Sequence, residues 1–330
     1  MMYNDAFLAR LGRLVGEARG RWDFGPDSRV ELLNISENAT YLLSEGGRRM
    51  ILRVHRPGYH TLDEIKSELA WIEALRASGT VETPKPIRGR DGELLQHLGT
   101  DGEARVAVGF DFVTGHEPKV DGNLPEWFRE LGRITARMHG QVRGWTLPPG
   151  FQRKVWNFDA ALGRVAYWGD WREGPGLDAQ GRALLQRTAD RIERETAALG
   201  TGAGHFGLVH ADLRLANLVV EGDRMTVIDF DDCGFSWLVY DFAAAITFLE
   251  HEPVVPELME SWVRGYRDIA PLSPTDEAAI PTMVMMRRIL ILAWIASHAE
   301  TPTAKAMGTT FTKQTLELAE AYLSRAETPR

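Results

Sequence analysis

Cysteine is almost absent from this chain of 330 residues, which contains only Cys233. A single thiol excludes an intrachain disulfide, and this fits a reducing, cytoplasmic compartment. The N-terminus also lacks a basic start followed by an apolar block, so we expect no signal peptide. Cys233 lacks the His or acidic pairing signature of a nucleophile, and we interpret it as a small packing residue.

Long apolar runs are missing as well. The most apolar late stretch, residues 289–296, is shorter than the ~20 residues that a bilayer-spanning helix needs. Arg287 and Arg288 directly precede it, and we interpret it as a buried core helix, which leaves no membrane partner. Basic charge is not in excess, because 38 Lys and Arg face 46 Asp and Glu, a net charge of −8. Nucleic acid is therefore not expected as a partner, whereas a nucleotide needs only a local basic pocket.

What the chain does contain is enough apolar sequence for a core, with 44% hydrophobic and 25% charged residues. In the first part, Thr61 and Glu64 form a capping-box pattern before an apolar stripe, which predicts the start of a helix. Turn residues separate the strand-like runs. The expected elements besides this helix are a leading helix over 6–16 and strands over 30–33, 40–43, 50–54 and 104–112.

After a linker around residues 115–122 the pattern becomes mainly helical. Residues 208–235 interrupt it with two short strand runs and acidic turns. An antiparallel meander with one helix, followed by helices, is typical of the α+β class. The expected helices lie over 127–138, 178–198, 241–250, 256–269, 275–298 and 310–323.

The informative segment is residues 208–232, LVHADLRLANLVVEGDRMTVIDFDD. His210-Ala211-Asp212 follows a short apolar run, and Asn217 lies five residues past Asp212. Asp229 stands twelve residues after Asn217, at the end of an apolar strand. Phosphoryl transfer needs a carboxylate that orients the acceptor hydroxyl and takes its proton, together with hard oxygen ligands for Mg²⁺. This spacing presents a base, a metal ligand and a second metal carboxylate, in the manner of protein kinases.

The pattern H-A-D-x-x-x-x-N followed by I-D-F-D resembles the aminoglycoside phosphotransferase superfamily, which includes type II homoserine, choline and hydroxylysine kinases and a bacterial stress-response kinase. The resemblance covers roughly residues 28–300 and implies a protein-kinase-like two-lobed fold with ATP between the lobes. An antiparallel-sheet lobe over 1–115 would bind the nucleotide, and a mainly helical lobe over 116–330 would hold the catalytic loop and the acceptor site.

Carried over residue by residue, the resemblance makes Asp212 the catalytic base, Asn217 a Mg²⁺ ligand and Asp229 the carboxylate that bridges Mg²⁺. The implied reaction is an ATP- and Mg²⁺-dependent transfer to a small-molecule hydroxyl acceptor of the amino acid, amino alcohol or aminoglycoside type. We also hypothesise that Arg214, two residues past Asp212, reaches the γ-phosphate and offsets its developing charge.

The resemblance also implies nucleotide-binding residues. Family members pair a basic residue on the third strand with a Glu on the next helix, and Arg53 and Glu68 occupy these places. Arg instead of Lys keeps the charge on a planar fork with a different reach. A glycine-rich phosphate loop is absent. The positions that stand in its place are Ser36 and Asn38, and those of the interlobe hinge are Asp111, Phe112 and Val113.

Several residues keep two interpretations. His210 is interpreted as a brace for the loop, and Asp241 either caps a helix or holds the backbone of the catalytic loop. Three tryptophans, which either line an acceptor pocket or pack a core, are Trp156, Trp168 and Trp171.

Other function classes stay open beside the small-molecule kinase. A protein serine/threonine kinase of the bacterial stress-response type would use the same chemistry. The absence of a glycine-rich loop, together with Arg53 in place of a Lys, would suit a non-catalytic nucleotide-binding pseudokinase. Asp229-Phe230-Asp231 mimics the start of a haloacid-dehalogenase phosphatase, but Cys233 stands where that motif has Thr or Val. The acceptor, the choice of ATP or GTP, and the oligomeric state are not specified by these residues.

Overall fold

A computed structural model describes residues 5–35, 38–99, 104–118 and 123–325. The chain forms two compact units. The first comprises Met1–His116, Leu147–Gln152 and Val219–Ile228, and the second comprises Glu117–Thr146, Arg153–Leu218 and Asp229–Arg330. The division after His116 lies next to the boundary expected at residue 115. The two later segments in unit 1 were not anticipated by a linear division of the chain.

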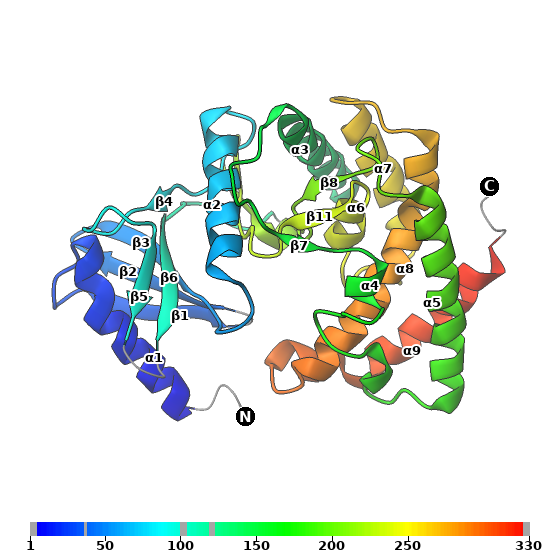
Figure 1. Ribbon diagram of the computed structural model, residues 1–330, viewed down its shortest axis with the longest axis horizontal. Helices are drawn as coiled ribbons and strands as arrows, with labels where there is room; N and C mark the ends of the chain where they lie inside the picture. The colour runs from blue at the N-terminus through cyan, green and yellow to red at the C-terminus, as the bar shows by residue number, and fades with distance from the viewer. Residues whose placement is uncertain (1–4, 36–37, 100–103, 119–122, 326–330) are drawn as a thin grey trace. The chain divides into compact units, whose positions relative to one another are not determined.

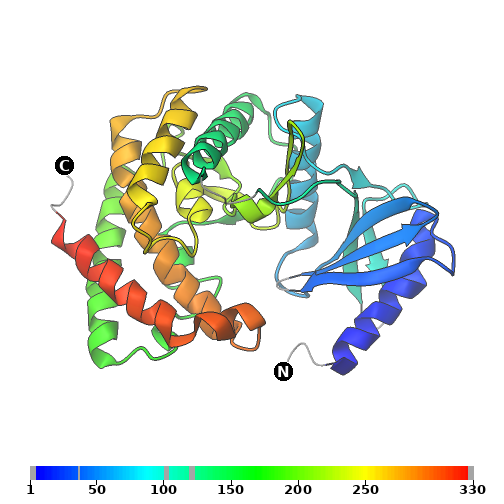
Figure 2. The same cartoon turned by 180° about the vertical axis from the view of Figure 1, so that it is seen from behind.

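Unit 1 is built on a six-stranded antiparallel sheet in the order β1-β2-β3-β6-β4, with β5 also paired to β6 (Figure 2). Alternate residues of β2, Ala39, Tyr41 and Leu43, are buried, because successive side chains of a strand point to opposite faces. β4 and β5 are additional to the expected strands. The strands are β1 (Arg29–Ile35), β2 (Ala39–Glu45), β3 (Arg48–Val54), β4 (Pro86–Ile87), β5 (Leu95–Leu98) and β6 (Arg105–Asp111).

Two helices flank this sheet. The leading helix α1 (Asp5–Ala18) buries Leu11 and Val15 in one cluster with residues of β2 and β3 (Figure 1). The second, α2 (Leu62–Ala77), begins at the predicted capping box. The Glu64 amide donates to Thr61 Oγ1 at 3.2 Å, and the Thr61 amide donates to Glu64 Oε2 at 2.7 Å. These two bonds set the start of α2 and thereby the place of Glu68 along it.

A hairpin of β9 (Leu218–Glu221) and β10 (Arg224–Val227) supplies the third segment of unit 1. It pairs with the end of the first segment, because His116 and Val220 exchange amide-to-carbonyl bonds of 3.0 and 2.8 Å. β9 follows the H-A-D loop directly, and Asp229 comes two residues after β10 ends. The hairpin therefore connects the two parts of the sequence motif.

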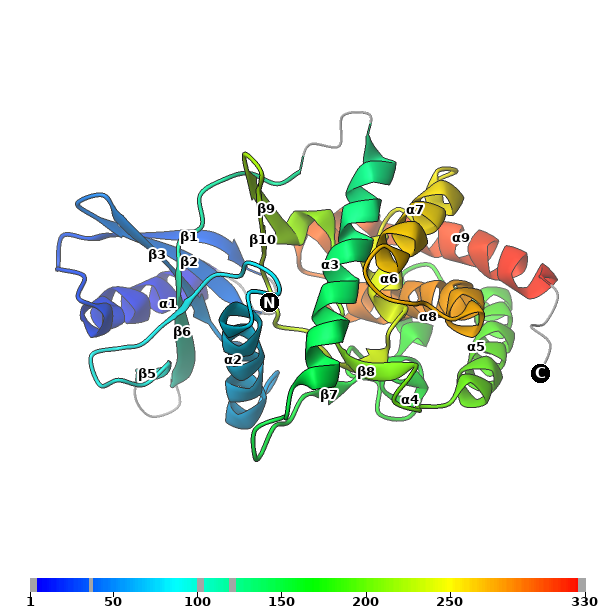
Figure 3. The same cartoon turned by 90° about the horizontal axis from the view of Figure 1, so that it is seen from above.

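Unit 2 is mainly helical, as expected (Figure 3). It also contains a small sheet in which β11 (Gly234–Trp237) pairs parallel with β7 (Lys154–Val155) and antiparallel with β8 (Phe206–Val209). The helices are α3 (Leu124–Gly144), α4 (Phe158–Ala161), α5 (Ala179–Leu199), α6 (Tyr240–Ala245), α7 (Val255–Arg267), α8 (Pro274–Ser297) and α9 (Pro302–Ser324).

α3 and α7 pack closely through glycines. A Cβ on Gly132 of α3 would collide with the Trp262 carbonyl, and one on Gly265 of α7 would collide with the Arg129 carbonyl. Only glycine permits this approach of two backbones. The close packing of the two helices places His139, on the buried face of α3, beside Tyr266 of α7, with 3.1 Å between His139 Nδ1 and the Tyr266 hydroxyl.

α8 is the central helix of unit 2 and contacts α5, α6 and α9. It is long and apolar enough to cross a bilayer, yet 72% of its most apolar window is buried inside the protein. Ile289, Leu290 and Leu292 are fully buried, so the predicted core helix is confirmed. Arg287 and Arg288, on the same helix, are also buried in the core.

α6 is shorter than the predicted helix over 241–250, because it ends at Ala245. Phe248 has a φ of 77°, which cannot continue a right-handed helix. Thr247 instead accepts a hydrogen bond from Arg287 at 3.3 Å. A tertiary contact therefore overrides the local helical pattern.

Candidate active site

The H-A-D loop runs from β8 to the short 3₁₀ turn η3 (Leu215–Asn217), within unit 2. His210 is completely buried, and its Nδ1 accepts from the Asp212 amide at 3.3 Å. Its ring packs on Phe230 with 4.6 Å between centroids. His210 thus braces the loop against the residue that follows Asp229, as interpreted from the sequence.

Ala211 has a φ of 65°, a left-handed conformation that a non-glycine residue adopts only when its surroundings hold it. The buried carboxylate of Asp241 supplies part of that support. Its Oδ1 accepts from the Ala211 amide at 2.7 Å, and its Oδ2 accepts from the His210 amide at 3.3 Å and from His139 Nε2 at 3.1 Å. Asp241 therefore holds the backbone of the loop and does not cap α6.

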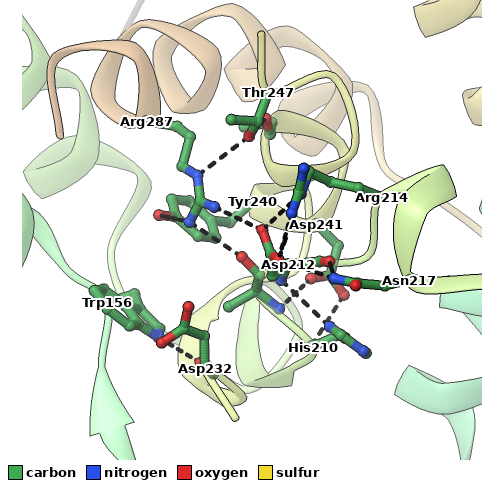
Figure 4. Close-up of polar contacts among 12 residues, drawn as sticks. Trp156, His210, Asp212, Arg214, Asn217, Asp232, Tyr240, Asp241, Thr247 and Arg287 are labelled. Carbon is green, nitrogen blue, oxygen red and sulfur yellow. Dashed lines mark hydrogen bonds and ion pairs between the residues drawn. The ribbon is translucent and has the colours of Figure 1, made fainter. Parts of the chain in front are cut away.

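The carboxylate of Asp212 is surrounded by donors (Figure 4). Arg287 Nη2 donates to Oδ1 at 2.9 Å, and Arg214 Nε lies 3.2 Å from the same oxygen. Asn217 Nδ2 donates to Oδ2 at 2.9 Å and to the Asp212 carbonyl at 2.7 Å. The side chain of Asp212 is 17% exposed, so this constellation keeps access to solvent.

The surroundings keep Asp212 ionised. Burial would raise the pKa of its carboxyl, but the charges of Arg214 and Arg287 outweigh that effect and lower the pKa below its usual range. Conversely, Asp212 raises the pKa of Arg214. Burial alone would lower the pKa of Arg287, yet Tyr240 and Asp212 raise it above the usual value. An ionised carboxylate can accept a hydrogen bond from an acceptor hydroxyl.

Asn217 and Asp229 offer the oxygen donors that Mg²⁺ prefers. Asn217 Nδ2 donates two hydrogen bonds to Asp212, so Oδ1, on the other side of the planar amide, points away from Asp212. Asp229 has a φ of 60°, a second strained position in the motif, and its charge acts on Arg214. A carboxylate and an amide oxygen beside the loop fit a divalent metal in type and number.

Arg53 and Glu68, predicted as a pair, form one in unit 1. Arg53 Nη2 donates to both Glu68 oxygens at 2.7 Å. Glu68 is fully buried and Arg53 is 7% exposed. The guanidinium also lies over the ring of Phe110, 5.2 Å from its centroid. The pairing is therefore present, while a contact of Arg53 with phosphates stays a prediction.

The other predicted nucleotide-binding residues differ in what surrounds them. Asn38 Oδ1 accepts from the Arg56 amide at 3.2 Å, whereas Ser36 lies outside the described residues. Asp111 ends β6, and the hinge residues after it line a pocket of about 530 Å³ in unit 1. Its lining includes Asp111, Phe112 and Val113.

The three tryptophans are buried, which supports packing as their role. Trp156, Trp168 and Trp171 have 0%, 5% and 1% of their surface exposed. Trp156 and Trp168 pack edge to face with 5.3 Å between their centroids, and Trp156 Nε1 donates to the Asp232 carbonyl at 2.8 Å. Cys233 is also fully buried, in agreement with its interpretation as a packing residue.

Sequence reasoning did not assign Arg287 to the site. It lies 75 positions after Asp212 in a helix that looks like core. The only signal is a pair of arginines directly before the apolar stretch 289–296, because a cation carried into a core needs a buried anion. His139, the third partner of Asp241, was also missed, because it too lies far from its partner along the chain, on a helix.

A model of the phosphotransferase enzyme family matches residues 30–276, more than half of the chain. A curated relative, amicoumacin kinase from Bacillus subtilis (strain 168), is 28% identical over 295 residues, which cover 84% of this chain and 83% of the relative.

Solved structures agree with this match. The structure of a microcompartment-associated aminopropanol kinase is 42% identical, with a TM-score of 0.88 and coverage of 94% of this chain and 97% of that one. An amicoumacin kinase in complex with AMP-PNP and Ca²⁺ is 22% identical, with a TM-score of 0.76 and coverage of 96% and 94%, and it shows the fold alone. The predicted kinase-like fold, with a sheet-based N-terminal part and a helical C-terminal part, is confirmed.

Proposed function

The chain belongs to the phosphotransferase enzyme family, and on that premise we propose that it transfers the γ-phosphoryl group of ATP to the hydroxyl of a small amino alcohol. The observation that carries this proposal is the setting of Asp212. Its carboxylate is ionised, partly open to solvent, and held on the same loop as Asn217, with Asp229 beside that loop.

Asp212 is the base in the proposed step. The acceptor oxygen forms a bond to the γ-phosphorus while the bond from that phosphorus to the bridging oxygen of ADP breaks. The hydroxyl proton passes to the Asp212 carboxylate late in this step, because the lowered pKa makes it a weak base. The main task of Asp212 is thus to orient the hydroxyl toward the phosphorus.

Each unit carries charged and polar groups that we assign to the nucleotide. In unit 2, Asn217 and Asp229 would hold Mg²⁺, which when bound neutralises the phosphate oxygens. Arg214 is 30% exposed in its side chain and is our candidate for the γ-phosphate. In unit 1, Glu68 orients the guanidinium of Arg53 for the α- and β-phosphates, and the backbone of residues 111–113 would bind the adenine edge.

An amino alcohol is the acceptor class that we favour. Support comes from the relation to the aminopropanol kinase, which is the more similar of the two solved structures described above. The net charge of −8 also tolerates a cationic substrate. With one buried cysteine and a mostly buried apolar helix, we propose that the enzyme works in the cytoplasm.

The test is a phosphorylation assay with radiolabelled ATP and Mg²⁺ on a panel of amino alcohols, amino acids, aminoglycosides and a model protein. We expect label on an amino alcohol and none without a divalent ion. Label on the protein alone would indicate the stress-response type of kinase. ATP binding without any transfer would indicate a pseudokinase, and either result would refute the proposed substrate class.

A further inference from the structure

Arg287 is a partner of Asp212 that lies outside the sequence motif. We propose that Arg287 is a positioning residue of the phosphotransfer site, which fixes both the carboxylate of Asp212 and the strained peptide that precedes it. The inference rests on the proposed function for its role in turnover. Its geometric part, the support of the loop, can be tested without activity.

The guanidinium of Arg287 reaches four groups at once. Nη2 donates to Asp212 Oδ1 at 2.9 Å, and Nη1 donates to the Ala211 carbonyl at 3.1 Å. Nη1 also lies 3.2 Å from the Tyr240 hydroxyl, and Nε donates to Thr247 Oγ1 at 3.3 Å. The planar fork of arginine permits this set of directions, whereas a lysine ammonium has three donors and no such plane.

Arg287 and Asp241 grip the two ends of the same residue. Asp241 accepts from the amide of Ala211 at 2.7 Å, while Arg287 donates to its carbonyl at 3.1 Å. With a φ of 65°, Ala211 stores strain that would relax if either grip were lost. Because Asp212 is the next residue, relaxation of Ala211 would turn the catalytic carboxylate away from its place.

Burial and ring contacts hold the side chain of Arg287 in place. Its side chain is 3% exposed and projects from α8, the central helix of unit 2. The guanidinium lies 5.3 Å from the centroid of the Trp168 ring and 5.7 Å from that of Tyr240. This gives the buried tryptophan a function beyond packing, since it limits the rotation of Arg287. Sites carried by helices and locked by packing hold their groups more precisely than loops do.

The neighbouring Arg288 provides a matched control. It is fully buried on the same helix and pairs with Glu250 at 2.6 Å. Its other donors reach Thr315 Oγ1 at 2.9 Å and the Phe311 carbonyl at 3.2 Å, both in α9. Loss of Arg288 leaves the buried carboxylate of Glu250 without this cation, at a distance from the H-A-D loop.

The experiment compares Arg287→Lys and Arg287→Met with Arg288→Lys and Arg288→Met in the full chain. We expect both Arg287 variants to lower kcat by about 100-fold, since a misplacement of about 1 Å costs roughly that much, while the KM for ATP changes less than threefold. Arg288 variants should lose stability but keep kcat.

Hydrogen exchange provides the readout that needs no activity. Peptides over residues 208–217 should exchange faster in Arg287→Lys than in Arg288→Lys, because only the first loses a support of the loop. Equal kcat or equal exchange in the two pairs would overturn the positioning role. An inactive wild type with faster exchange in Arg287→Lys would refute the proposed function and leave the support of the loop standing. If Arg287→Met does not fold, the lysine pair decides.

Discussion

Replacing Asp212 by Asn tests the assignment of the base, because the substitution keeps the shape of the side chain and removes its charge. The amide oxygen, in the place of Oδ1, can still accept from Arg287, whereas the new NH₂ group, in the place of Oδ2, meets the donors of Asn217 and Arg214. We expect a loss of about 1.5–3 kcal/mol in the free energy of unfolding, the range for hydrogen bonds to charged groups. The fold should survive this loss.

The effect on turnover should be larger. A general base contributes about 10²–10⁴ in rate, which corresponds to about 2.7–5.4 kcal/mol of the barrier. Steady-state kinetics of Asp212→Asn should show that loss in kcat, and calorimetric titration should show ATP affinity within threefold of the wild type. Urea unfolding separates the loss of activity from the loss of stability. Turnover above a tenth of the wild type, or a selective loss of nucleotide affinity, would refute the assignment.

Three further predictions concern Arg53, the titration of Asp212 and the support of the loop that carries Asp212. Arg53→Met should raise the KM for ATP about tenfold, since a hydrogen bond to a charged group is worth about 1.5–3 kcal/mol, and an unchanged KM in steady-state assays would remove Arg53 from the phosphates. The lowered pKa of Asp212 predicts that its ionised form, with the stability it contributes, is complete above about pH 4 and is lost as the pH falls further. A kcat profile with an acid limb at pH 5 to 6 would contradict this. Asp241→Ala orphans the amides of Ala211 and His210 and should cost about 1–3 kcal/mol for each in urea unfolding, and a variant as stable as the wild type would show that the loop is held by other groups.

Local chemistry explains the parts of the fold that the sequence predicts well. The capping box of Thr61 and Glu64 marks the start of α2, because both partners lie within four consecutive residues. Turn residues between the strand-like runs likewise locate β2 and β3. β4, with two residues, and β5, with four, are too short to show a period, and their strand character comes from pairing with β6.

The site divides in the same way. The sequence predicts Asp212 and Asn217 together because a hydrogen-bonded turn keeps them at a fixed spacing. It predicts the pair of Arg53 and Glu68 because a strand and the next helix bring the two side chains together. The sequence does not reveal the role of Arg287, since its partners come from the loop and from Tyr240 in α6, far away along the chain. The end of α6 was misjudged for a related reason, because Arg287 engages Thr247.

The most direct test of the account identifies the product. Wild-type protein would be incubated with ATP, Mg²⁺ and an amino alcohol such as 1-amino-2-propanol, and the mixture followed by ³¹P NMR. The account predicts a phosphate monoester whose phosphorus couples to the proton of the carbinol carbon, formed in step with ADP. Inorganic phosphate as the only new signal, or phosphorus bonded to the amine nitrogen, would contradict transfer to a hydroxyl oriented by Asp212.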